Sequence, residues 1–159
     1  MTNKASSKIF QVFAALAFSL GSAGAGAAQI YWADWLPTLN PPATGFTGEG
    51  LITTPTSTVS VTYNNPQGVA FYQTSGGADY YSGGTATTSP YTSAAVDNRP
   101  TGTDIIALQY SGSQTLQFSQ AIANPVFAFV SLNGNGYGFD RDFNILSFGD
   151  PSDGNACGY

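Results

Sequence analysis

Four aspartates near the C-terminal end of the sequence are the residues best suited to holding a metal ion. Asp140, Asp142, Asp150 and Asp153 fall within 14 residues, on both sides of Arg141. Carboxylate oxygens on loops are the ligands that calcium prefers, so these side chains are the candidate calcium ligands. Aspartate is also a common turn residue, because its side chain hydrogen-bonds to the nearby backbone. The cluster is therefore interpreted either as a calcium site or as ordinary turns in which Arg141 pairs with one aspartate.

Aromatic side chains in polar, glycine-rich surroundings suggest a second kind of site. Aromatic rings stack on the apolar faces of sugars, while amide and carboxylate groups reach the sugar hydroxyls. The candidates for a glycan-binding surface are Tyr80, Tyr81, Tyr91 and Tyr137. The two tryptophans, Trp32 and Trp35, are instead expected to pack in the core or at its rim.

The sequence lacks the residue types on which most acid–base and nucleophilic catalysis depends. It has no histidine and one cysteine, which excludes the usual Ser-His-Asp and Cys-His arrangements and structural zinc sites. A glycosidase needs two carboxyl groups about 5 to 10 Å apart, and nothing in the sequence selects such a pair. Glu49, in Gly48-Glu49-Gly50, is interpreted as a solvated turn residue. We therefore expect a protein that is not an enzyme and has no cofactor, calcium excepted.

Residues 1–28 have the three parts of a secretory signal peptide. Lys4 and Lys8 give a positively charged start, and Ile9–Leu20 is a mostly apolar stretch of 12 residues, too short to span a bilayer comfortably. Gly21–Ala28 contains only Gly, Ala and Ser, as a signal peptidase site requires. Cleavage is expected after Ala28, with two nearby alternatives, Ala25 and Ala27. An uncleaved membrane anchor is the competing interpretation, although no stop-transfer pattern follows the stretch.

Removal of this leader leaves a mature chain, residues 29–159, with very little positive charge. Both lysines leave with the leader, so two arginines remain against nine acidic residues, a formal charge of −7. Such a chain cannot follow a phosphate backbone and is repelled by anionic lipid, so we expect no nucleic-acid partner. We also expect no stable membrane span in the chain once the leader is cleaved. Cys157 is the single cysteine, which indicates an intermolecular disulfide, a reactive thiol or a partner beyond a truncated end.

The mature chain is predicted to be an all-β domain. Short runs rich in Val, Ile, Thr, Tyr and Phe are bounded by Gly, Pro, Asn and Ser, which is typical of strands and turns. The predicted strands are Gln29–Trp35, Thr58–Tyr63, Val69–Gln73, Ile106–Tyr110, Thr115–Ser119, Val126–Leu132 and Phe143–Phe148. Seven or eight short strands of this kind favour an antiparallel β-sandwich of jelly-roll or immunoglobulin-like type.

Two hairpins and one central strand are expected within that sandwich. Thr58–Tyr63 is predicted to pair with Val69–Gln73 across a loop at 64–68, and the strand ending at Tyr110 is predicted to return after a turn at 111–114. Val126–Leu132 is apolar on both faces, which is typical of a strand covered on both sides. Residues 75–100 have no sustained period and are interpreted as a long loop or as irregular edge strands.

Five segments together resemble secreted bacterial proteins that carry a C-terminal PEP-CTERM sorting signal. They are Tyr31–Trp35, Val59–Tyr63, Thr103–Leu108, Asn124–Gly134 and Asp142–Gly149. The resemblance implies further strands, then a Pro-Glu-Pro motif, a short hydrophobic helix and a basic tail. None of these occurs before Tyr159, and Glu49 is the only glutamate. We therefore expect a fragment whose sandwich is incomplete at its C-terminus and, in the full-length form, exosortase-type processing in exopolysaccharide-producing bacteria.

These observations lead to an expected function outside the cell. The chain is predicted to be a non-catalytic protein of the bacterial envelope or extracellular matrix, acting as a structural or adhesive module at the cell surface. Its expected partners are extracellular polysaccharide or envelope components. The alternative is a carbohydrate-binding module, assisted by calcium.

Overall fold

The computed structural model describes residues 10–11, 15–17, 26–38, 44–82, 89–130 and 136–149. Within these residues every regular element is a β-strand, and all pairs of neighbouring strands run antiparallel. The all-β, antiparallel prediction is therefore confirmed for the described part of the chain. A search of the same residues for a helix long and apolar enough to cross a membrane found none.

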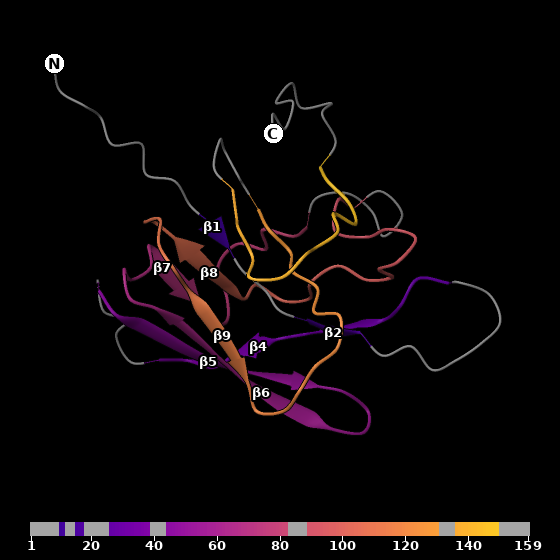
Figure 1. Ribbon diagram of the computed structural model, residues 1–159, viewed down its shortest axis with the longest axis horizontal. Helices are drawn as coiled ribbons and strands as arrows, with labels where there is room; N and C mark the ends of the chain where they lie inside the picture. Colours follow the sequence, from indigo (N-terminus) through magenta and orange to yellow (C-terminus); the bar gives the residue numbers. More distant parts are fainter. Residues whose placement is uncertain are drawn as a thin grey trace, which may run out of the picture.

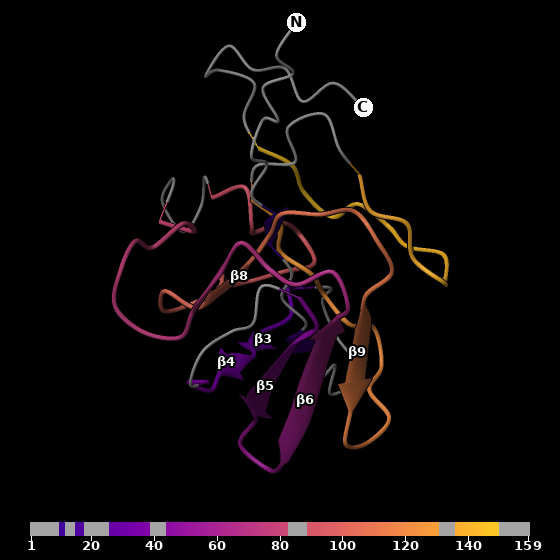
Figure 2. The same cartoon turned by 90° about the vertical axis from the view of Figure 1, so that its left-hand side faces the viewer.

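The largest sheet contains four strands in the order β4-β5-β6-β9, which lie side by side in Figures 1 and 2. They are β4 (Asp34–Trp35), β5 (Phe46–Thr53), β6 (Thr58–Asn65) and β9 (Thr115–Phe118). β5 and β6 pair along their whole length, from Phe46 opposite Asn65 to Thr53 opposite Thr58. The turn between them is closed by Thr54, whose N–H donates to the Ser57 carbonyl at 2.8 Å.

Strict alternation along β5 and β6 gives this sheet one buried and one exposed face. Val59, Val61 and Tyr63 are at most 1% exposed, as their period of two predicts. Phe46 and Ile52 of β5 are fully buried on the same side. Together with Trp35, Ile105, Ile106 and Leu108 they belong to one continuous core.

Two smaller sheets complete the described structure. One has the order β1-β8-β7, formed by β1 (Phe10–Gln11), β8 (Ile105–Leu108) and β7 (Phe71–Gln73). The other pairs β2 (Ala15–Ala17) with β3 (Ile30–Trp32). The predicted strand over residues 29–35 is therefore present in two pieces, β3 and β4, which belong to different sheets.

Both predicted hairpins are wrong, although the chain does turn at residues 65–68. Asn65 closes the first turn, because its carbonyl accepts from Gly68 N–H at 3.0 Å and its side-chain oxygen accepts from Gln67 N–H at 3.0 Å. Gly68 has a φ of 84°, which turns the chain out of the sheet. As a result β7 pairs with β8 instead of β6.

The second expected hairpin fails because β9 joins the larger sheet. β9 pairs with β6, not with the strand that precedes it. That preceding strand, β8, ends at Leu108, and Tyr110 is 51% exposed beyond it. All four residues of β8 are buried, so this strand takes neighbours on both edges, β7 and β1.

The two C-terminal strands are not observed among the described residues. Residues 127–130 and 143–148 form no strand, while 131 and 132 lie outside the described ranges. Ala128 is nevertheless buried, at 4% exposure, and its neighbours pack against the core. The side chains of Phe143, Ile145, Leu146 and Phe148 are 43 to 66% exposed. The second edge of β8 is occupied by β1.

The long segment at 75–100 is irregular, as expected, with residues 83–88 outside the described ranges. Its last part holds the start of β3 in place. Asn98 donates from its amide to the Ile30 carbonyl at 2.9 Å and accepts from Ile30 N–H at 2.7 Å. Ala28 also bridges Val96 in parallel. These contacts lie next to the expected cleavage site and involve residues on both sides of it.

Candidate binding surfaces and a buried carboxyl group

The four candidate glycan-binding tyrosines do not form one exposed surface. Tyr81 is 1% exposed and meets Tyr91 edge to face, with 5.1 Å between ring centres. Tyr137 stacks on Phe129 at 4.3 Å. Burial raises the pKa of Tyr91 to about 12 and also raises those of Tyr81 and Tyr137. These three rings pack in or against the core, so they are not positioned as a platform for a sugar.

Tyr80 is the one of the four whose ring is substantially exposed. It is 38% exposed, and its ring centre lies 6.2 Å from that of Phe71 at an angle of 33°. Adjacent residues in the 79–82 turn thus point in opposite directions, with Tyr81 inward and Tyr80 outward. The turn is held by Asp79, whose side chain accepts from Tyr81 N–H at 2.9 Å and pairs with Arg99 at 3.3 Å. Arg99 also donates to the Tyr81 carbonyl.

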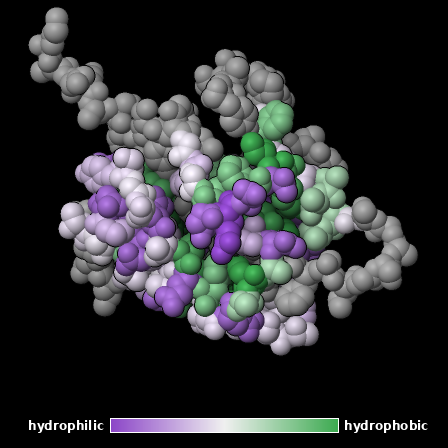
Figure 3. Space-filling model, viewed as in Figure 1, coloured by the Kyte–Doolittle hydropathy of each residue, from purple (hydrophilic) through white to green (hydrophobic). Residues whose placement is uncertain are grey.

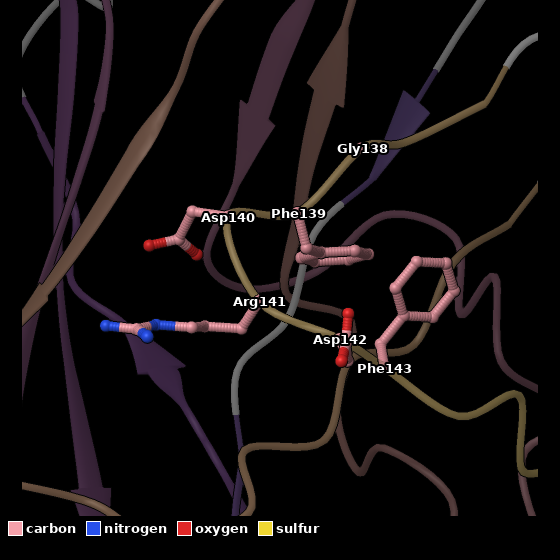
Figure 4. A pocket seen from close by; sticks show the side chains of 6 residues that line it. All are labelled: Gly138, Phe139, Asp140, Arg141, Asp142 and Phe143. Carbon is pink, nitrogen blue, oxygen red and sulfur yellow. The ribbon is translucent and has the colours of Figure 1, made fainter.

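The acidic loop at residues 138–143 is exposed and surrounds a shallow, open depression (Figure 4). Asp140 and Arg141 project to one side of the loop, whereas the rings of Phe139 and Phe143 lie on the other, 4.9 Å apart. Asp142 is also exposed. The remaining candidate ligands, Asp150 and Asp153, lie outside the described residues. Within the described ranges no group of three metal-ligating side chains occurs.

Asp104 is a buried carboxyl group that the sequence analysis did not select. It is 8% exposed, and its Oδ2 accepts a hydrogen bond from Trp35 N–H at 2.7 Å. Burial, the largest effect, raises its pKa to about 6; the Trp35 N–H opposes that shift and the neighbouring Asp34 carboxylate adds to it. A carboxyl group with such a pKa can exchange a proton near neutral pH.

The surroundings of Asp104 indicate a structural role. Trp35, which donates to it, is itself 1% exposed in the core. The carboxylate therefore ties the segment before β8 to β4, across 69 residues of sequence. The one available sequence signal was an aspartate directly before four apolar residues, and that pattern gives no indication of its distant partner.

The exposed side of the β5-β6-β9 sheet is a continuous surface of hydroxyl and amide side chains, named here the hydroxyl–amide face. Its strands are in register, with Asn64 between Thr47 and Thr115, and Thr62 between Glu49 and Gln117. The members of the face are Thr47, Glu49, Leu51, Thr53, Thr58, Ser60, Thr62, Asn64, Thr115 and Gln117.

Hydrogen bonds across neighbouring strands fix several of these side chains. Asn64 Nδ2 donates to Thr47 Oγ1 at 3.1 Å, and Thr62 Oγ1 donates to Glu49 Oε2 at 2.9 Å. The interpretation of Glu49 as a turn residue is therefore wrong, because it lies within β5 and is the one charged member of the face. Alternation along β6 and β9 separates their inward from their outward residues, but it does not show that the two strands share a surface.

Comparisons of the chain with protein-family models, with curated proteins and with solved structures found no match. The geometry described above is therefore the basis for the functional argument.

Proposed function

We propose that the mature protein is a non-catalytic module of the bacterial envelope or extracellular matrix that acts structurally or adhesively through its hydroxyl–amide face. The observation that supports this most strongly is the composition of that face, nine polar residues and Leu51, with a single charge. Strands in a sheet lie about 4.8 Å apart, so hydroxyl and amide groups recur at regular intervals across the face. Such an array can hydrogen-bond to a neutral, hydroxyl-rich polymer along its length.

The proposal includes removal of residues 1–28, location outside the cell or at its surface, and completion of the all-β domain as a sandwich of jelly-roll or immunoglobulin-like type. It also includes exosortase sorting of the full-length form. Support for export comes from the charge and composition of the leader and from the sparsely charged mature chain.

The adhesive role is tested by changing the face without changing the core. A variant carries Thr53→Lys, Ser60→Lys and Gln117→Lys, one exposed position on each of β5, β6 and β9. The control carries the same three charges on exposed loop positions, Ser75→Lys, Ala94→Lys and Thr101→Lys. Retention on beads of neutral matrix polysaccharide is measured at physiological salt.

We expect the face variant to lose at least tenfold in retention and the control to match the wild type. Circular dichroism checks that both variants remain folded. Equal retention of both variants, or no retention of the wild type, would reject the proposed role of the face.

A second candidate, a carbohydrate-binding module assisted by calcium, is favoured by the exposed ring of Tyr80 and the exposed aspartates of the 138–143 loop. It predicts saturable binding to particular glycans on an array, lost in Tyr80→Ala. No binding with or without calcium would eliminate this candidate.

A further inference from the structure

The second edge of β8 is occupied by residues that the mature protein is expected to lose. β7 pairs with one edge of β8, and β1 pairs with the other through Phe10 opposite Leu108 and Gln11 opposite Ala107. β1 lies within residues 1–28. β2, from the same leader, pairs with β3 through three residues.

Cleavage at the expected site would open this edge in a buried place. All four residues of β8 are at most 2% exposed. Backbone N–H and C=O groups that lose their partners inside a protein are costly and are rarely left unpaired. The hydrogen bonds between Ile30 and Asn98 would remain, because both residues belong to the mature chain. The mature chain therefore needs another strand beside β8.

Residues 143–148 have the properties of that missing strand. The segment is six residues long and rich in apolar side chains, and the sequence predicts it to be a strand. In the described structure Phe143 and Ile145 are each 58% exposed and Phe148 is 66% exposed. Hydrophobic side chains of described residues are visible at the surface in Figure 3.

The segment contacts residues 89–100, a part of the chain that also contacts the end of the leader. Ser147 Oγ donates to the Pro90 carbonyl at 2.6 Å, at the start of the 89–100 segment. The same segment carries Val96, which bridges Ala28 at the end of the leader. The leader offers β8 two paired residues, whereas a six-residue strand can pair with all four.

We propose that the leader temporarily occupies the place of a C-terminal strand, and that its removal lets Phe143–Phe148 add to the free edge of β8. The inference rests on leader cleavage and not on the adhesive role. It makes the leader a device that keeps the fold unfinished until export is complete.

Thiol labelling before and after processing tests the exchange in the full chain. In a Cys157→Ser background, single cysteines are placed at Ile145 and, in a second variant, at Leu146, so that both faces of the segment are sampled. Tyr110→Cys, 51% exposed and outside the segment, is the control. Each precursor is labelled with a maleimide before and after treatment with signal peptidase.

We expect processing to slow labelling of at least one of the two segment cysteines tenfold or more, with no change at position 110. Hydrogen exchange of the unsubstituted protein gives an independent readout. Amides of 105–108 should stay protected after processing, and those of 143–148 should become protected.

Three results would overturn the proposal. The first is unchanged labelling and exchange of 143–148 after cleavage. The second is protection that appears only with dimer formation at high concentration, which would show that a second copy supplies the strand. The third is failure of the peptidase to remove the leader. None of these readouts involves polysaccharide, so they are independent of the adhesion test.

Discussion

The buried carboxyl group of Asp104 makes the stability of the domain depend on pH in a defined direction. Its pKa in the folded protein is raised to about 6 from an ordinary value of 3.8. The folded state therefore binds more protons than the unfolded state between about pH 4 and pH 6. Stability from this group is fully present below about pH 4 and is lost as the pH rises through 6.

The magnitude follows from the size of the shift. One pKa unit corresponds to about 1.4 kcal/mol, so a shift of about two units corresponds to about 3 kcal/mol. Asp104 lies near the surface beside exposed Asp34, where solvent screening reduces this to about 1.5 kcal/mol. For a domain of this size, that corresponds to a change of about 5 °C in Tm.

Two substitutions separate the charge of Asp104 from its hydrogen bond. Asp104→Asn keeps an oxygen that can accept from Trp35 N–H and removes the titration. At pH 7 it should be more stable than the wild type by about 1.5 kcal/mol, and the difference should vanish by pH 4. Asp104→Ala leaves the buried Trp35 N–H without this acceptor and should lose about 1–3 kcal/mol at pH 4. The loss should be smaller at pH 7, because this variant also lacks the titrating group.

Urea unfolding of the wild type and both variants at intervals from pH 4 to 7 measures these differences. At each pH the free energy of unfolding of the wild type is subtracted from that of Asp104→Asn. The other carboxylates are the same in both proteins, so their contribution cancels. A difference that stays constant over this range, or that grows toward acid pH, would refute the assignment of the raised pKa to a buried Asp104.

Three further predictions concern packing, loop structure and metal. Gly50→Ala would place a methyl group 2.9 Å from the ring of Trp35 and should lower the free energy of unfolding by about 1–3 kcal/mol, measured in urea. The control Gly136→Ala, whose methyl group would meet no atom within 4 Å, should be neutral. Equal effects of the two substitutions would contradict the close packing of Trp35 on Gly50. Arg99→Gln removes a partly exposed ion pair with Asp79 and should lower the free energy of unfolding by less than about 1 kcal/mol. Hydrogen exchange of the backbone amides in the 79–82 turn should become faster. An unchanged exchange rate would mean that the ion pair does not hold this turn. A chelator should lower the melting midpoint if the C-terminal aspartates bind calcium, and an unchanged midpoint would remove them as a metal site.

The local period of the sequence identified β6, β8 and β9 but neither their pairing nor β5. Alternation in Thr58–Tyr63 indicates a strand with one apolar side, because a period of two is a property of the strand itself. The turn at Asn65 and Gly68 was also recognisable from its residue types. The partner of the strand after this turn was not recognisable. β7 pairs with β8 instead of folding back on β6, and that choice depends on where β8 is buried.

The candidate site residues were hard to predict for a related reason, since exposure and long-range contacts are not determined by the local sequence. Tyr80 and Tyr81 are neighbours of the same type, and composition could not tell the exposed ring from the buried one. The role of Asp104 depends on Trp35, which is far away in the sequence. The hydroxyl–amide face required the register of three strands, which the sequence pattern does not determine.

Chemical-shift mapping of the mature protein with soluble fragments of a neutral matrix polysaccharide tests the central claim most directly. The account predicts shifts concentrated on the outward residues of β5, β6 and β9, with the residues around Tyr80 and the 138–143 loop unchanged. Shifts confined to Tyr80 and that loop, or none at saturating fragment, would contradict it.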